Sequence, residues 1–137
     1  MENQKQSTYR IALYSRLALY SEDEMVAQCD MIRDFAKKQG FENCKEYCDN
    51  GYGGLNLDRP AFAELEKDID AGKVTTIIVK GIDRIARNFV LTSEWLNRTE
   101  EKGVKVIAAD DSHKPSPYTL EVVKFLKERG IRHESLL

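Results

Sequence analysis

Four arginines in this chain have the chemistry and the spacing to bind one oxyanion together. Each lies shortly after an apolar segment or in the loop that follows one; they are Arg16, Arg59, Arg84 and Arg87. A guanidinium carries a permanent positive charge and a fork of donors that matches phosphate oxygens. Phosphoryl transfer depends mainly on positioning and charge stabilisation, so such a cluster favours a phosphodiester ligand. The arginines can stabilise the charge of the transition state without a metal ion.

The elements that must position these arginines alternate between strands and helices. Ser21-Glu-Asp-Glu24 is a capping-box pattern that starts a helix, and Pro60 suits a first helical turn. Gly40 and Gly103 stand where helices should end. The apolar spacing predicts strands at residues 11–14, 44–48, 74–79 and 104–108, and helices at about 22–39, 60–71, 88–102 and 118–129.

This alternation predicts an α/β fold: a three-layer α/β/α sandwich around a mostly parallel sheet with right-handed crossovers. Residues 74–79 are β-branched on both faces, as a central strand should be. Ligands of such sheets bind at the carboxyl ends of the strands. Those ends fall within residues 14–18, 49–59 and 80–87, which contain the four arginines together with Lys80 and Asp83.

Length and charge limit the partners that the chain can bind. With 137 residues it is the size of one domain, and its net charge of −2 argues against nucleic-acid binding through bulk positive potential. Any DNA contact must come from a local cluster, and it should be weak and address the phosphate backbone. No apolar run approaches the ~20 residues of a membrane span, and the polar N-terminus lacks a signal sequence. We therefore expect no membrane partner and a cytoplasmic location.

The cysteines and histidines predict no metal centre. Cys29, Cys44 and Cys48 are odd in number and form no C-x-x-C pair, so neither a disulfide framework nor a zinc site is indicated. His113 and His133 stand alone. Met25, Cys29 and Trp95 have helical spacing and are expected in the core.

Several ordered motifs resemble the catalytic domain of serine site-specific recombinases of the resolvase/invertase class. The resemblance covers about residues 9–111, and the order of the motifs makes it specific. The motifs are Tyr14-Ser-Arg16-Leu-Ala18, Gln28, Asp49 ahead of a glycine loop, Asp58-Arg59-Pro60-Ala-Phe62 and Ile82-Asp83-Arg84-Ile-Ala-Arg87.

The resemblance implies a resolvase-like fold and a set of site roles. Asp83 would position an arginine or assist proton transfer, and Tyr14, Gln28, Asp49 and Lys80 would be supporting residues. In that family a serine attacks the scissile phosphate and forms a phosphoserine link without metal or cofactor. The implied partners are the DNA phosphate backbone and, in the full-length protein, further copies of the same chain. The residues that would bind and activate the phosphate are Arg16, Arg59, Arg84 and Arg87.

Two positions depart from the family pattern. Ala18 stands where the family has its nucleophilic serine, and Gly53-Gly54 replaces the usual Ser-Gly. Alternation along an extended segment puts Ser15 on the face opposite Arg16, so it is a poor substitute nucleophile. Ser21 is expected to cap a helix instead. As written, the chain is expected to lack strand cleavage.

Other interpretations remain open from the sequence. Each arginine could be structural, and Asp83 with Arg87 at i, i+4 could be an ordinary ion pair on a helix. A non-enzymatic resolvase-like domain that docks on DNA or partner subunits is the main alternative. A flavodoxin- or receiver-like domain shares the alternating architecture, but a receiver needs an acidic cluster where Arg16 stands. The expected organisation is a catalytic-type domain over residues 1–111, with a linker and short helix over 112–137 that belong to the same domain or form its truncated extension.

Overall fold

The computed structural model describes residues 11–111, in which strands and helices alternate. The structure confirms the predicted α/β class. The predicted helix at 118–129 lies outside the described residues. The elements are β1 (Ile11–Leu17), α1 (Glu22–Lys38), β2 (Cys44–Asn50), α2 (Pro60–Asp70), β3 (Thr76–Val79), a 3-10 helix (Ile82–Arg84), α3 (Phe89–Glu101), β4 (Lys105–Ala108) and a second 3-10 helix (Ala109–Asp111).

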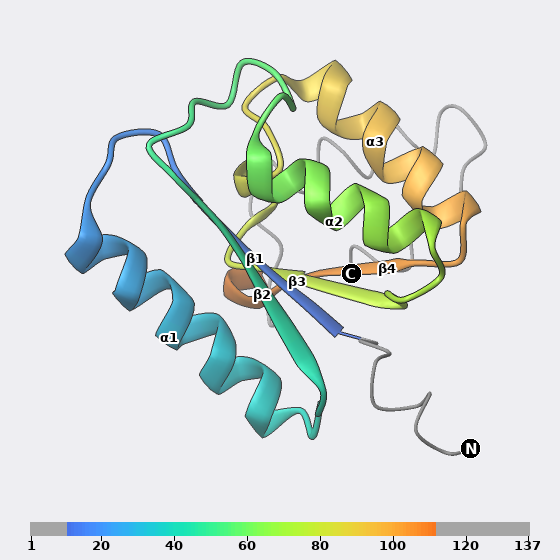
Figure 1. Ribbon diagram of the computed structural model, residues 1–137, viewed down its shortest axis with the longest axis horizontal. Helices are drawn as coiled ribbons and strands as arrows, with labels where there is room; N and C mark the ends of the chain where they lie inside the picture. Colours follow the sequence, from blue (N-terminus) through green and yellow to red (C-terminus); the bar gives the residue numbers. More distant parts are fainter. Residues whose placement is uncertain (1–10, 112–137) are drawn as a thin grey trace.

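The sheet has four strands in the order β2-β1-β3-β4, and all pairs are parallel. Helix α1 covers one face, whereas α2 and α3 cover the other (Figure 1). Right-handed crossovers explain this division. The chain moves across the sheet in one direction from β1 to β2 through α1, and in the opposite direction from β2 to β3 through α2 and from β3 to β4 through α3. The result is the predicted three-layer sandwich, and its strand order reverses between β1 and β3.

Helices α1 and α2 begin where the predicted signals place them, and α3 has a side-chain cap that was not predicted. The Ser21 hydroxyl accepts a hydrogen bond from the Glu24 backbone N–H, and Pro60 opens α2. The Asn88 side chain caps α3 by accepting from the Leu91 N–H. Ser21 and Pro60 were sufficient to predict where α1 and α2 begin, because cap geometry depends on a few neighbouring residues.

Strand boundaries differ more from the prediction. β1 continues to Leu17 rather than ending at Tyr14, because Arg16 and Leu17 still pair with β2 through Asp49 and Asn50. Polar residues hid this extension from the apolar pattern. β3 begins at Thr76, although Val74 before it is buried.

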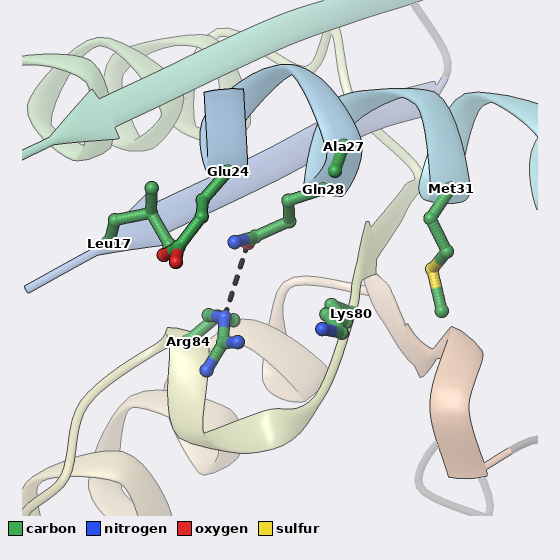
Figure 2. Close-up of a pocket in the computed structure, with 7 residues that line it drawn as sticks. All are labelled: Leu17, Glu24, Ala27, Gln28, Met31, Lys80 and Arg84. Carbon is green, nitrogen blue, oxygen red and sulfur yellow. Dashed lines mark hydrogen bonds between the residues drawn. The ribbon is translucent and has the colours of Figure 1, made fainter. Parts of the chain in front are cut away.

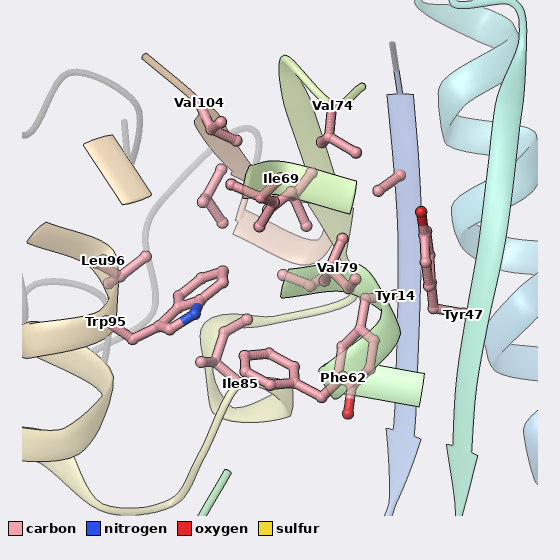
Figure 3. Close-up of a cluster of buried hydrophobic side chains, with 14 of the residues drawn as sticks. Tyr14, Tyr47, Phe62, Ile69, Val74, Val79, Ile85, Trp95, Leu96 and Val104 are labelled. Carbon is pink, nitrogen blue, oxygen red and sulfur yellow. The ribbon is translucent and has the colours of Figure 1, made fainter. Parts of the chain in front are cut away.

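Each face of the sheet has its own apolar cluster, as the alternation of side chains requires. Towards α1, Leu13 of β1 packs with Ile32 and Ala36. Towards α2 and α3, the Phe62 ring lies between Tyr14 and Trp95, with ring centroids 5.3 and 5.2 Å away (Figure 3).

Two of the three residues expected in the core are buried, Met25 and Trp95. The prediction for Cys29 was wrong, because it is only half buried at the edge where α1 faces β2. Within residues 11–111, no helix is long and apolar enough to cross a membrane.

Ile32→Ala should lower the free energy of unfolding by about 2–5 kcal/mol, since it leaves a cavity in the layer beneath α1. Ile32 is 1% exposed, whereas Val26 on the same helix is 58% exposed. Val26→Ala is the matched control and should change stability by no more than about 0.5 kcal/mol. Urea unfolding followed by circular dichroism measures both, and equal losses would contradict this assignment of the buried face.

Candidate functional site

The candidate site lies at the carboxyl end of β1, where the strand order reverses. In open α/β sheets this is the place where ligands bind. β3 pairs with β1 only as far as Tyr14 opposite Val79. Beyond that point the chain after β3 turns away into the 3-10 helix Ile82–Arg84, so Arg16 on β1 has no strand beside it on that side.

The Gln28 side chain takes the place of the missing strand. Its amide oxygen accepts from the Arg16 N–H at 3.1 Å, and its amide nitrogen donates to the Arg16 carbonyl at 3.3 Å. The same oxygen accepts from Arg84 Nε at 3.2 Å. Gln28 therefore satisfies buried backbone groups of β1 and ties α1 to the segment after β3.

The Arg16 guanidinium is buried and faces backbone carbonyls. Nε donates to the Arg84 carbonyl at 3.0 Å, Nη1 to Tyr52 at 2.9 Å and Nη2 to Asp83 at 2.9 Å. Burial, followed by the positive charge of Arg59, lowers the pKa of Arg16. An arginine still keeps its proton at neutral pH, so this side chain brings a charge into the interior and joins two loops.

Arg59 holds the same segment from the other side. It is 2% exposed, and its Nη2 donates to the carbonyls of Asn56 and Ile85, while Nη1 donates to the Tyr14 hydroxyl and to the Arg84 carbonyl. Nε is buried without a partner among the described residues. The carbonyls of Asp83, Arg84 and Ile85 are therefore all held by guanidiniums.

Asp49 supplies the buried negative charge beneath these arginines. Its carboxylate accepts from the Tyr14 hydroxyl at 2.7 Å and from the N–H groups of Ala61 and Phe62 at 2.9 and 3.0 Å. Arg59, the N-cap residue directly before α2, makes no side-chain cap. A strand residue thus caps the helix, and the positive end of the helix dipole stabilises its charge.

The Tyr14 hydroxyl links Asp49 to Arg59. Burial is the main reason that the pKa of Tyr14 is raised, and the hydrogen bond to Asp49 adds to it. Tyr14 therefore stays protonated at neutral pH. It donates to Asp49 and accepts from Arg59 Nη1, so the charges of Asp49 and Arg59 connect through a neutral group.

Arg84 and Arg87 are the more accessible arginines. Arg84 is half buried and its Nη1 lies 3.0 Å from the Asp83 carboxylate, whereas Arg87 is exposed. The i, i+4 ion pair between Asp83 and Arg87 is not the arrangement seen, because Asp83 pairs with its sequence neighbour in the 3-10 helix.

The absence of a side chain at Gly54 lets Arg87 approach Arg16 closely. The Arg87 N–H donates to the Gly54 carbonyl at 2.9 Å. A Cβ at Gly54 would stand 2.5 Å from Arg87 Cγ, 2.9 Å from Arg87 N and 3.1 Å from Arg16 Nη2. All four arginines thus meet in one region. The glycine loop was noted in the sequence for departing from the family pattern, but its close contact with Arg87 has no sequence signal.

Ala18 lies exposed immediately beyond β1, two residues after Arg16. Ser15 is 1% exposed and contacts Cys29 on the α1 side, and Ser21 caps α1. The Ser15 and Ser21 hydroxyls are therefore both engaged in structural contacts.

A pocket of about 220 Å³ opens between α1 and the segment after β3 (Figure 2). Lys80 and Arg84 form one side of it, and Gln28 reaches across to Arg84 (Figure 2). The residues that line it are Leu17, Glu24, Ala27, Gln28, Met31, Lys80 and Arg84. Among residues 11–111, no three His, Cys, Asp or Glu side chains are grouped so that they could hold a metal ion.

Comparison with known proteins identifies the family. Residues 11–130 match the family described as resolvase, N-terminal domain. The chain belongs to the resolvase family. A protein of Bacillus subtilis (strain 168) named as a DNA recombinase is 25% identical over 108 residues, which is 78% of this chain. The resolvase-family chain spans only 22% of the length of that relative.

Solved structures share the resolvase-family fold. The N-terminal catalytic domain of TP901-1 integrase is 22% identical, with a TM-score of 0.74 over 88% of this chain and 94% of the other. A resolvase family site-specific recombinase from Streptococcus pneumoniae is 25% identical, with a TM-score of 0.65 over 90% of this chain and 88% of the other. These likenesses confirm the resolvase-like α/β fold.

Gly54→Ala should lower the free energy of unfolding by about 1–3 kcal/mol, because its methyl group would overlap Arg87. Gly53→Ala is the matched control, since a Cβ there meets nothing within 4 Å, and its effect should stay within about 0.5 kcal/mol. Chemical denaturation gives both values. A Gly54→Ala protein as stable as the Gly53→Ala protein would rule out the close contact.

Asp49→Asn should cost about 1–3 kcal/mol of stability. The amide has one acceptor where the carboxylate has two, so either the Ala61 or the Phe62 N–H loses its partner, and the charge at the start of α2 is lost as well. Asp58→Asn changes an exposed carboxylate nearby and should have little effect. Thermal unfolding compares the two, and an equally small shift for both would contradict the capping role.

Proposed function

We propose that this chain is the catalytic domain of a site-specific DNA recombinase that keeps its phosphate-binding residues but lacks its nucleophile. The observation that carries the proposal is the meeting of arginines from three strand ends in one hydrogen-bonded network, next to the exposed end of β1 where Ala18 lies. Family membership supports the choice of a DNA phosphodiester over other phosphates.

The four arginines have different parts in this proposal. Arg84 and Arg87 are accessible, so they contact the scissile phosphate directly, and Lys80 adds positive charge from the pocket. Arg16 and Arg59 donate to the carbonyls of the segment that carries Arg84, and they fix its position from beneath. Their buried charges also raise the positive potential at the phosphate.

Asp83, Tyr14, Gln28 and Asp49 act through these arginines. The Asp83 carboxylate orients the Arg84 guanidinium, and Gln28 holds Arg84 Nε. Tyr14 and Asp49 orient Arg59. The expected partner is the phosphate backbone of DNA, contacted weakly and with little sequence preference by this chain. A homo-oligomer of the full-length protein and a cytoplasmic location are further parts of the proposal.

The nucleophilic step explains why Ala18 matters. A serine hydroxyl at this position would attack the phosphorus, form a phosphoserine ester and release the 3′ oxygen of the broken strand as a hydroxyl. Ala18 ends in a methyl group and cannot form this bond. A metal-free exchange conserves the phosphodiester energy in the phosphoserine link, so no other cofactor is required for rejoining.

A second function is favoured by Ala18 itself. A chain that binds phosphate but cannot cleave would act as a docking domain on DNA or on recombinase subunits. The two functions differ in whether the rest of the site remains competent for chemistry.

Ala18→Ser should restore covalent chemistry. We expect the variant, fused to a sequence-specific DNA-binding domain and given duplex DNA with that domain's site, to form a protein–DNA adduct at residue 18. The hydroxyl is added at an exposed position, so stability should change by no more than about 0.5 kcal/mol. Mass spectrometry of the trapped peptide locates the phosphoserine.

The unaltered Ala18 fusion is the matched control and should give no adduct. Ala18→Ser combined with Arg87→Ala should lose most of the adduct, whereas Ala18→Ser with Arg98→Ala removes an exposed arginine on α3 and should keep it. An adduct with the Ala18 protein, at Ser15 or Ser21, would contradict the nucleophile assignment. A folded, DNA-bound Ala18→Ser fusion that forms no adduct would favour the docking function.

A further inference from the structure

Two cysteines that are distant in the sequence meet between α1 and β2. The Cys29 and Cys48 sulfurs lie 3.3 Å apart, and Cys29 Sγ also donates to the Ser15 hydroxyl at 3.6 Å. The strand register explains the contact. Ser15 of β1 pairs with Cys48 of the parallel strand β2, so both side chains point to the sheet face that α1 covers, and Cys29 packs onto them from the helix.

We propose that Cys29 and Cys48 form a reversible intramolecular disulfide when the protein meets a small-molecule disulfide such as oxidised glutathione. A disulfide bond is about 2.05 Å long, so the two sulfurs need to approach by little more than about 1 Å. Cys48 is exposed and Cys29 is half buried, so an oxidant can reach the pair from solvent. This inference does not depend on the proposed recombinase function.

The reaction has two exchange steps. The Cys29 thiolate attacks one sulfur of the small disulfide, forms a mixed disulfide and releases one glutathione thiolate. Cys48 then loses its proton, attacks the Cys29 sulfur and releases the second glutathione. Two protein thiols are oxidised and one small disulfide is reduced to two thiols, so electrons and protons balance.

The environment of Cys48 sets the order of these steps. The residue is exposed overall, but partial burial of its thiol against α1, followed by the contact with Cys29, raises the pKa of Cys48 to about 12. Cys48 therefore keeps its proton at neutral pH, and the thiolate is the attacking form. The first attack falls to Cys29, and Cys48 closes the bridge once the mixed disulfide lies beside it.

The bridge would restrain the two segments that carry Gln28 and Asp49. Cys29 follows Gln28, which holds Arg16 and Arg84, and Cys48 precedes Asp49, which caps α2 and binds Tyr14. A covalent link would join the helix and the strand that carry these side chains.

Cys44 provides an internal control. It lies on β2 four residues before Cys48, which places it about 13 Å away along the strand. Bridged cysteines need Cα atoms within about 7 Å of each other. Cys44 therefore cannot replace Cys29 as the partner of Cys48.

The test is incubation of the purified protein with oxidised glutathione, followed by thiol titration after unfolding and by peptide mapping without reductant. The chain has three cysteines, and after oxidation only Cys44 should keep a free thiol. The peptide map should contain a linked Cys29–Cys48 peptide that dithiothreitol separates. Cys44→Ser should form the same link. Cys29→Ser and Cys48→Ser should each form no internal link. Cys48→Ser should carry glutathione on Cys29, whereas Cys29→Ser should react with oxidised glutathione more slowly, because Cys48 keeps its proton at neutral pH.

A second measurement tests the restraint. Closing the loop between residues 29 and 48 should raise the melting temperature of the oxidised protein by roughly 5–10 °C, and reduction should reverse the rise. The Cys48→Ser protein should show no such rise. The proposal would be overturned by persistent free thiols at Cys29 and Cys48, or by separate glutathione adducts on both in the unsubstituted chain. An unchanged melting temperature after the bridge has formed would contradict the restraint.

Discussion

The arrangement of this site depends on one constraint: the carbonyls of residues 83–85, which are partly or fully buried, need donors, and two buried guanidiniums supply them. Arg16 and Arg59 reach the segment from different elements, and both share the Arg84 carbonyl as an acceptor. Burying a guanidinium costs less when most of its donors are hydrogen-bonded and a negative group lies close by. Asp49, linked through Tyr14, is that group.

This constraint connects the fold to the chemistry. β3 ends before β1 does, which leaves room for a turn after β3 and exposes the end of β1 to a side chain from α1. Gln28 fills that place and also touches Arg84. The same contacts that satisfy the end of the sheet therefore hold the accessible arginines. A substitution that disturbs the end of β1 is expected to displace those arginines as well.

An alanine at position 18 costs the site no structural contact, because residue 18 is exposed beyond the strand. The arginine network is built from backbone carbonyls, Gln28 and Asp49, and none of its bonds involves the Ala18 side chain. A site of this kind can lose its attacking atom and keep its packing. This is the physical basis for expecting that one added hydroxyl restores the chemistry.

The amino-acid sequence was enough to predict the elements and their layers, and it also gave the expectation that a site lies at the carboxyl ends of the strands. Caps at Ser21 and Pro60 and β-branched strands are local signals, and parallel strands bring their carboxyl ends to one edge. It could not determine which arginines are buried, that Asp49 caps a helix, or that Gly54 has no room for a Cβ. It also did not reveal the meeting of Cys29 and Cys48, which are 19 residues apart. Those features depend on strand register and on contacts between distant segments, and only the tertiary structure decides such contacts.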